Sequence, residues 1–446
     1  MQKALFSLVA MSCLLAVSNV HASSMLSNDV GSYRTIGGEQ PLLGETLSIA
    51  SYKNALGVGT FVAGSNDDQF PTYSAVLQYF NNTSQNAPKS SLVTVPKISN
   101  PYQSGVANSP MIIKLSIHRK TLYFAESSFY ENPSNQDERK YASVLYTVAL
   151  NNHGAVPDEA DFHTVSLQGL PTLSSYPSYV LWFGDIPTRK GHGINTVVLA
   201  EKKAGSQGGE YEIYQQSKSG VWKKQADYHT NIDMEYPYSG FAGVPPRINL
   251  VSNGRKTALI FSVRRTKGSQ PTSPIVRFVF NKKGIPAASA QLLALPANIG
   301  QADPNWVTGL NYVHTSSMDT LFLTLNTAGV YTMPARKALR NKPKASNWHQ
   351  VNMGQYNDGT RIFYSAVPAI GSPNPNSIHF MMYPKTGGGF QKIVSCDIAQ
   401  DPKDTSCVEV ENSLYMPWAS GTMFTAGTDS FAIYSGRVAI YRHSSN

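Results

Sequence analysis

Four short apolar segments separated by turns recur along this chain of 446 residues. The clearest example lies between residues 236 and 295, where segments 257–263 and 275–280 are rich in Val, Ile, Leu and Phe. Turn sequences stand between the segments, such as Ser-Asn-Gly at 252–254 and Asn-Lys-Lys-Gly at 281–284. Segments of this kind favour β-strands, and little helical periodicity lies between them. The pattern therefore predicts a unit of four short strands.

The same plan predicts seven successive units. Their first strands begin near residues 46, 111, 178, 239, 307, 361 and 421, so the repeat is roughly 55 to 68 residues long. The second and third strands give the clearest signal, as in the apolar pair 321–325 and 329–333. The predicted strands outside the example above are 46–52, 56–63, 74–80 and 91–95; 111–117, 121–126, 143–150 and 162–167; 178–183, 196–200, 211–215 and 220–224; 307–314, 320–325, 329–333 and 348–352; 361–367, 377–383, 391–398 and 406–410; and 421–426, 430–434 and 437–442.

Seven four-stranded units of this length resemble the blades of seven-bladed β-propellers. The resemblance covers the mature chain and rests on repeat length and strand count. It implies an all-β fold in which each blade is a four-stranded antiparallel sheet. The last unit has three predicted strands, while residues 33–36 form a lone strand near the N-terminus. If this strand completes the last blade, it closes the ring and removes an exposed edge. A pair of β-sandwiches is the alternative fold.

The N-terminus predicts export. Lys3 precedes an apolar stretch from 4 to 17, and Val20 and Ala22 suit signal peptidase. We expect cleavage after Ala22, a single domain over residues 23–446, and a secreted or periplasmic protein. A lipoprotein anchored at Cys13 is the weaker alternative, because the apolar run continues past this residue. No other segment is long and apolar enough to predict a transmembrane helix.

Two cysteines, Cys396 and Cys407, remain after the signal, and they lie on neighbouring predicted strands of the sixth unit. In an exported chain this arrangement predicts a disulfide. A metal-binding pair is the alternative, but no His accompanies either cysteine at ligand spacing.

The formal net charge of +9 predicts a weak attraction to anionic surfaces, with anionic cell-surface material as a candidate partner. The basic residues look scattered and fall mostly in predicted hairpin turns, with pairs at 223–224, 264–265 and 282–283. We therefore expect a solvated rim rather than a nucleic-acid groove, and we expect no nucleic-acid partner.

The loops that enter the first strands share Pro and an aromatic residue, and a propeller gathers such loops at one mouth of its channel. The aromatic residues are Tyr179, Tyr238, Trp306 and Trp418. One interpretation is an aromatic mouth that holds sugar rings or an extended peptide. The other is packing between blades, which repeats because the geometry repeats.

Polar residues that break the repeat are further site candidates. They are Asp185, with Arg189 and His192; Asp233 and Glu235; and Asp358, with Arg361. Asp233 and Glu235 suit an acid/base pair for glycan cleavage, but a solvated or salt-linked pair explains them too and is the interpretation that we favour. The histidines show no HxH or HExxH spacing, so we expect no catalytic zinc and no cofactor.

The sequence thus predicts an exported, non-catalytic binding or scaffold protein that recognises a glycan, a peptide or a partner protein at the channel mouth. The alternative is a glycan-active enzyme, a hydrolase or lyase, with carboxylates at that mouth. A cluster of Asp233, Glu235, Asp303 and Asp358 without basic partners would favour the enzyme.

Overall fold

The structure is a computed structural model. It describes residues 32–35, 45–53, 55–62, 74–80, 90–94, 111–132, 134–152, 154, 163–171, 178–201, 209–230, 248–262, 275–297, 307–325, 329–356, 361–369, 374–384, 392–399, 405–410, 421–426, 429–434 and 439–444.

The strands of these residues form seven four-stranded antiparallel sheets. Sheet 1 contains β2 (Glu45–Tyr52), β3 (Ala55–Val62), β4 (Ser74–Phe80) and β5 (Ser90–Thr94). Sheet 2 contains β6 (Met111–His118), β7 (Thr121–Asn132), β8 (Asn135–Ala149) and β9 (His163–Thr164). Sheet 3 contains β10 (Ser178–Pro187), β11 (Gly193–Glu201), β12 (Glu210–Gln216) and β13 (Trp222–His229). Sheet 4 contains β14 (Asn249–Ser252), β15 (Thr257–Ser262), β16 (Ile275–Phe280) and β17 (Gln291–Leu293).

The remaining sheets include short helical segments and both ends of the described chain. Sheet 5 contains β18 (Val307–His314), β19 (Asp319–Leu325), β20 (Gly329–Pro334) and β21 (His349–Gln350); helix α2 (Ala335–Ala338) and the 3-10 helix η2 (Ala345–Asn347) lie between β20 and β21. After a second 3-10 helix, η3 (Gly354–Tyr356), sheet 6 contains β22 (Arg361–Pro368), β23 (Ser377–Pro384), β24 (Lys392–Asp397) and β25 (Ser406–Glu409). Sheet 7 contains β26 (Gly421–Ala426), β27 (Asp429–Tyr434), β28 (Ala439–Ser444) and the N-terminal strand β1 (Ser32–Thr35).

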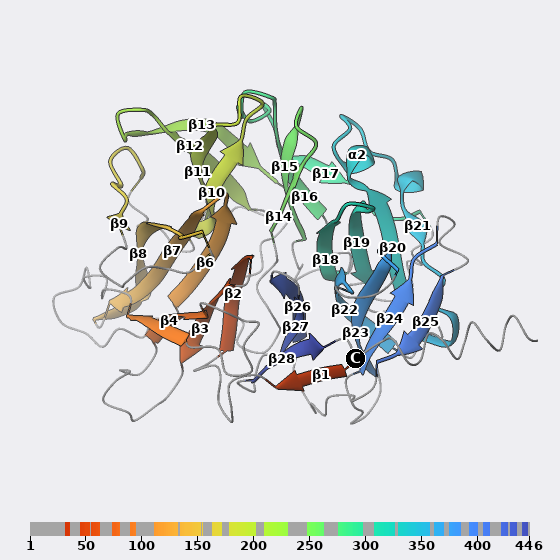
Figure 1. Cartoon of the computed structure of the whole chain (residues 1–446). Helices are drawn as coiled ribbons and strands as arrows, with labels where there is room; N and C mark the ends of the chain where they lie inside the picture. Colours follow the sequence, from red (N-terminus) through yellow and green to blue (C-terminus); the bar gives the residue numbers. More distant parts are fainter. Residues whose placement is uncertain are drawn as a thin grey trace, which may run out of the picture.

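The sheets follow one another around a common centre (Figure 1). First strands of neighbouring sheets lie together: β6 contacts β2 and β10, β18 contacts β14 and β22, and β26 contacts β22 and β2. Successive four-stranded antiparallel sheets arranged in this way form a β-propeller. The prediction of an all-β propeller of four-stranded antiparallel sheets is confirmed.

The hydrophobic core lies between neighbouring sheets. Phe278 of sheet 4 illustrates it, because its ring contacts Tyr211 and Tyr228 of sheet 3 at centroid distances of 5.2 and 5.1 Å. Sheet 4 is covered on its other face by sheet 5, where Ile260 packs in the same cluster as Leu310. Both faces of β15 and β16 are therefore buried, which explains why their sequences are mostly apolar and do not alternate between apolar and polar residues.

Polar side chains on the first strands bind the next sheet. The amide of Asn249 donates to the carbonyl oxygen of Leu310 at 2.9 Å and accepts from the backbone N–H of Tyr312 at 2.9 Å. Asn311 repeats half of this pattern one sheet later, accepting from the backbone N–H of Ala366 at 3.2 Å. These bonds fix the register between sheets where backbone pairing does not extend.

The predicted start of the fourth unit, near residue 239, lies outside the described residues, which exclude 231–247; β14 is described from Asn249. Other elements differ from the predictions. The hairpin of β7 and β8 extends well beyond the predicted strands. Helix α2 was not predicted, because one turn is too short to show a period.

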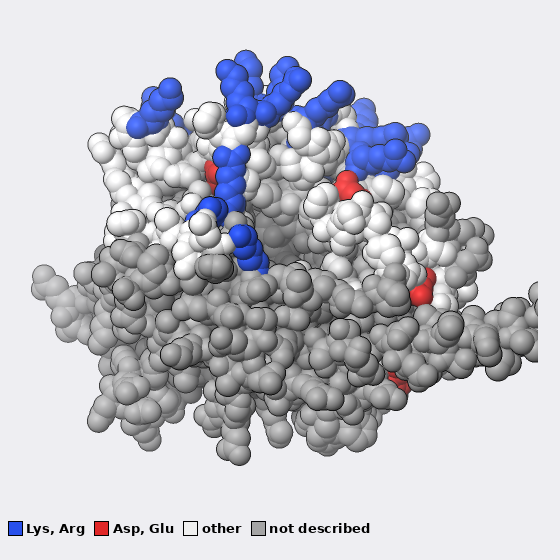
Figure 2. Space-filling model, viewed as in Figure 1, with Lys and Arg blue, Asp and Glu red and all other residues white. Residues whose placement is uncertain are grey.

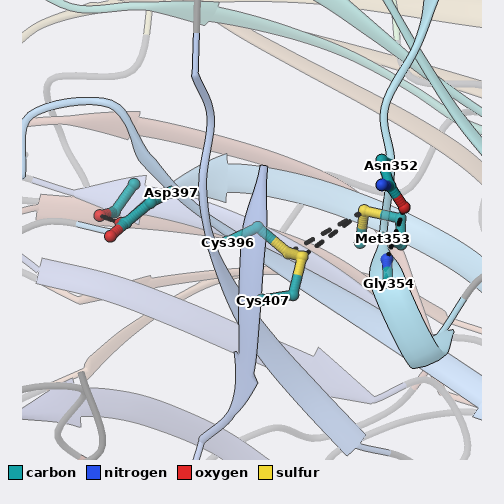
Figure 3. The surroundings of a disulfide bond; sticks show 7 residues. Asn352, Met353, Gly354, Cys396, Asp397 and Cys407 are labelled. Carbon is teal, nitrogen blue, oxygen red and sulfur yellow. Dashed lines mark hydrogen bonds between the residues drawn. A yellow bond between two sulfur atoms is a disulfide. The ribbon is translucent and has the colours of Figure 1, made fainter. Parts of the chain in front are cut away.

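The predicted disulfide is confirmed. Cys396 and Cys407 face each other in the register of β24 and β25, with their Cα atoms 4.1 Å apart. This separation is slightly shorter than the ~4.5 Å of the closer kind of opposed pair on antiparallel strands. The sulfur atom of Met353 lies 3.9 Å from each cysteine sulfur and covers the bond (Figure 3).

The predicted signal peptide, residues 1–22, lies outside the described residues. Within the part of the chain that the structure describes, no helix is long and apolar enough to cross a membrane.

Candidate functional site

The turns of each sheet sort onto two faces of the molecule. Because the four strands of a sheet run alternately up and down, the turn after the first strand and the turn after the third strand emerge on the same side. We call this side the turn face. The first strands begin on the opposite side, which we call the entry face.

Contacts between successive turns make the turn face continuous. Lys53, after β2, and Lys120, after β6, both donate to Asn152, after β8, at 2.5 Å. Two sheets further on, the backbone N–H of Arg189, after β10, donates to the carbonyl oxygen of Lys282, after β16, at 3.0 Å. The first turn of one sheet therefore rests on the second turn of the next.

The turn face is strongly basic. In the space-filling view, lysine and arginine side chains stand along its edge above sheets 3 to 5 (Figure 2). The described turn residues on this face that carry a positive charge are Lys53, Arg119, Lys120, Arg189, Lys190, Lys218, Arg255, Lys256, Lys282, Lys283, Arg336, Lys337, Arg340, Lys342 and Lys344. None of the described residues in the turns of this face is Asp or Glu. Outside the described part lie Asp158, Glu159 and Asp161, between β8 and β9, and Asp401 and Asp404, between β24 and β25. We call the set of described lysines and arginines the basic face.

Arg277 fixes the part of the basic face that α2 carries. This side chain of β16 is fully buried and donates to the carbonyl oxygens of Ala338 and Asn341, the latter at 3.0 Å, and to the side chain of Gln291. These carbonyl oxygens lie at the C-terminal end of the α2 segment, where they have no N–H partner within the helix. The Arg277 guanidinium supplies the missing hydrogen-bond donors. Burial lowers the pKa of Arg277 to about 10, which leaves it charged at neutral pH.

A buried polar pair lies beneath the basic face. Asp185, near the end of β10, places its Oδ2 atom 3.6 Å from Nε2 of His118, the last residue of β6. Asp185 is 8% exposed, and burial raises its pKa to about 6, while the nearby Arg119 opposes the rise. Burial also lowers the pKa of His118, with Arg119 acting in the same direction. At neutral pH the pair therefore holds a neutral imidazole beside a carboxylate.

The backbone leaves room for this carboxylate. A Cβ atom at Gly193, directly after the β10–β11 turn, would overlap the Asp185 side chain. Among the described residues, Oδ1 of Asp185 and Nε2 of His118 are buried without a hydrogen-bond partner. A buried carboxylate with a raised pKa is the kind of group that active sites use for proton transfer.

The predicted site residues divide between described and undescribed parts. Tyr179 and Asp185 lie on the same strand, six residues and therefore about 20 Å apart, so the structure does not bring them together. Tyr179 is 4% exposed and packs in the core between sheets 3 and 4. Asp185 lies near the turn face, whereas Tyr179 is near the entry face.

Arg189 and His192, which were predicted together with Asp185, are exposed in the turn between β10 and β11. The remaining predicted residues carry no described side chain. Arg361 begins β22, with only its backbone described. Outside the described residues lie Asp233, Glu235, Tyr238, Trp306, Asp358 and Trp418.

No metal site emerges from the described residues, since they contain no group of three or more His, Cys, Asp or Glu placed to hold an ion.

Comparison with known proteins gives similarities of fold. No protein-family model matches the sequence, and no curated protein matches it. Sqt1 from Chaetomium thermophilum is 9% identical, with 94% of this chain and 98% of that chain covered and a TM-score of 0.43. Sucrose-6-phosphate hydrolase from Lactobacillus gasseri is 12% identical over 93% of both chains, with a TM-score of 0.40. The GH93 α-L-arabinofuranosidase of Fusarium graminearum is 11% identical, covering 73% of this chain and 89% of its own, with a TM-score of 0.39. Similarities at this level assign no activity to the chain.

Proposed function

We propose that the protein is a closed, seven-bladed propeller that binds an anionic partner through its basic face. Closure is supported by the pairing of β1 with β28 in the sheet of β26 and β27, and by the contact between β26 and β2. A closed ring holds its turns in fixed positions, as a binding surface requires.

One observation carries the binding proposal: the described turns of one face contain many lysines and arginines and no acidic residue. Charges of one sign on neighbouring turns repel one another and weaken folding slightly. An anionic partner removes this repulsion and gains the attraction of several cations at once. The predicted export, supported by the Cys396–Cys407 disulfide, would place this surface outside the cytoplasm.

Chromatography on an anionic resin tests the proposal. We expect the protein to bind heparin-agarose, not uncharged agarose, and to elute at a salt concentration that falls in the variant Arg189→Gln/Lys190→Gln, because binding that depends on several charges weakens with salt. The matched control is Lys392→Gln, whose side chain on β24 is paired with Glu409 at 2.8 Å. Equal elution of both variants and the unaltered protein would contradict the proposal.

A glycan-active enzyme is the second candidate, and Asp185 favours it. Its pKa near 6 suits a general acid near neutral pH. Glycoside cleavage also needs a second carboxylate within about 10 Å. A polysaccharide-hydrolysis screen tests this: activity that disappears in Asp185→Asn, in a protein that still folds, would support the enzyme.

The entry face remains our proposed location for a glycan, peptide or protein ligand that contacts Tyr238, Trp306 and Trp418. A glycan array probed with the mature protein, with Trp306→Ala and Trp418→Ala as variants, checks this proposal. Binding that both variants retain would remove the aromatic mouth from consideration.

A further inference from the structure

We propose that the partner of the basic face is the surface of an anionic phospholipid membrane. This inference rests on the proposed function, because it names the anionic partner that the basic face binds. Three features of the face favour a lipid surface over an anionic polymer: its breadth, its choice of cation, and an exposed apolar side chain among the charges.

The cations extend over the turns of several sheets. They come from turns of five successive sheets, 1 to 5, and the bonds between turns hold neighbouring positions together. Lys256, after β14, extends this linkage by donating to the side chain of Asn341 in the α2 segment at 2.5 Å. The side chains project outward from one edge of the molecule (Figure 2). A wide array of outward charges can contact many headgroups at once.

The type of cation suits headgroups. Lysines outnumber arginines on the basic face, and the lysine ammonium is a compact point charge that attracts anions without demanding a fixed geometry. Polymers that carry bases or sugar rings are commonly held by aromatic faces as well. Among described side chains, the large apolar ones that are exposed are Leu167, Ile285 and Leu292, none of them aromatic.

Ile285 adds the apolar contact that membrane binding uses. It is 45% exposed and follows Lys282, Lys283 and Gly284 in the tight turn after β16. Apolar side chains flanked by lysines enter the boundary between headgroups and acyl chains, while the ammonium groups stay at the headgroups. A soluble polyanion has no acyl-chain region in which the exposed side chain of Ile285 could be buried.

Vesicle co-sedimentation tests the inference. We expect the full mature protein to sediment with vesicles of phosphatidylcholine and phosphatidylglycerol, but not with vesicles of phosphatidylcholine alone. Each lysine near an anionic membrane surface strengthens binding about fivefold. The variant Lys282→Gln/Lys283→Gln should therefore bind the anionic vesicles about 25-fold more weakly, and Lys392→Gln should bind as the unaltered protein does.

Ile285→Ser separates a membrane from a soluble polyanion. We expect this variant to lose vesicle affinity by several-fold while its binding to heparin and to duplex DNA stays unchanged. Binding to heparin or DNA without binding to anionic vesicles would overturn the membrane inference and leave the proposed function standing. Failure to bind heparin, DNA and anionic vesicles would overturn both. Circular dichroism of each variant establishes that a loss of binding is not a loss of folding.

Discussion

The Asp185 side chain occupies the space that a side chain at position 193 would need. A Cβ at Gly193 would overlap the Asp185 carboxylate, and the β10–β11 hairpin places the two residues on adjacent strands. Gly193→Ala should lower the free energy of unfolding by about 1–3 kcal/mol, the usual effect of overpacking. Chemical denaturation at pH 7 measures this change.

A double-mutant cycle tests the cause. Asp185→Ala removes the atoms that the new methyl group would meet, so Gly193→Ala should cost less in an Asp185→Ala background. Additive effects of the two substitutions would mean that the cost of Gly193→Ala does not come from contact with Asp185.

Lys114 introduces a pH dependence on the innermost strand of sheet 2. The residue is 7% exposed, and burial lowers its pKa from the usual 10.5 to about 8. The folded protein thus holds this proton more weakly than the unfolded chain does, so stability rises with pH between about 8 and 10.5. Below pH 8 the buried charge opposes folding in full.

Lys114→Met should therefore raise the free energy of unfolding at pH 7 by about 1–3 kcal/mol, with the gain shrinking as the pH approaches 10.5. Unfolding curves at several pH values measure it, and Lys218→Met, at an exposed turn position, is the control with almost no expected effect. Destabilisation by Lys114→Met at every pH would contradict the account, because the amine would then be supporting the fold.

At the residue scale, the sequence predicted Asp185 as a site candidate but missed His118. Asp185 stands out in the sequence because it breaks the repeat, and the structure gives it a buried, perturbed environment. Its neighbour His118 could not have been chosen, since 67 positions separate the two and only the contact between sheets 2 and 3 brings them together. The position of a residue within its strand can be predicted from nearby sequence. Which residue of another sheet it contacts cannot.

At the scale of elements, the disulfide gives a direct prediction. The Cys396–Cys407 bond closes a loop with a sequence separation of 11, for which restriction of the unfolded chain contributes about 3 kcal/mol. The double variant Cys396→Ala/Cys407→Ala should lose about this much stability and melt several degrees lower. Thermal denaturation measures the loss, and peptide mapping without reductant should recover the two cysteines as one linked peptide. Two free thiols in the exported protein would contradict it.

The strands and turns could be predicted from the sequence, but the basic face that the turns form together could not. Apolar runs bounded by Gly, Asn and Pro place most strands to within one or two residues, as for β4 and β18. The charges in the turns were also visible, and they look scattered along the chain. They gather on one face only because alternate turns of antiparallel sheets point the same way, a fact of topology that no window of sequence contains.

At the scale of the whole molecule, β1 gives the most decisive test. Its register runs from Ser32 opposite Ser444 to Thr35 opposite Tyr441. Deleting residues 23–37 removes β1 and exposes the edge of β28, so the melting temperature should fall and the protein should associate. Thermal denaturation and light scattering measure the two effects.

Deleting residues 23–30 is the matched control, because it leaves β1 in place; it should change neither property. Similar behaviour of the two truncations would mean that β1 does not close the ring, and the number of blades would have to be revised. The sequence predicted this strand only by arithmetic, since the last unit lacked a fourth strand and residues 33–36 had no partner nearby.

Because β1 pairs with β28, the two ends of the described chain lie side by side. The same arrangement of strands around the ring could therefore be kept if the chain began at a different strand. Ser32 and Ser444 are cross-strand neighbours, so a short linker can join the two ends of the described chain. New ends can then be opened in a turn between two other sheets. In such a circularly permuted protein every sheet would be made of consecutive strands. It would keep the basic face intact while moving the point of attachment for a fused domain from sheet 7 to a sheet of choice.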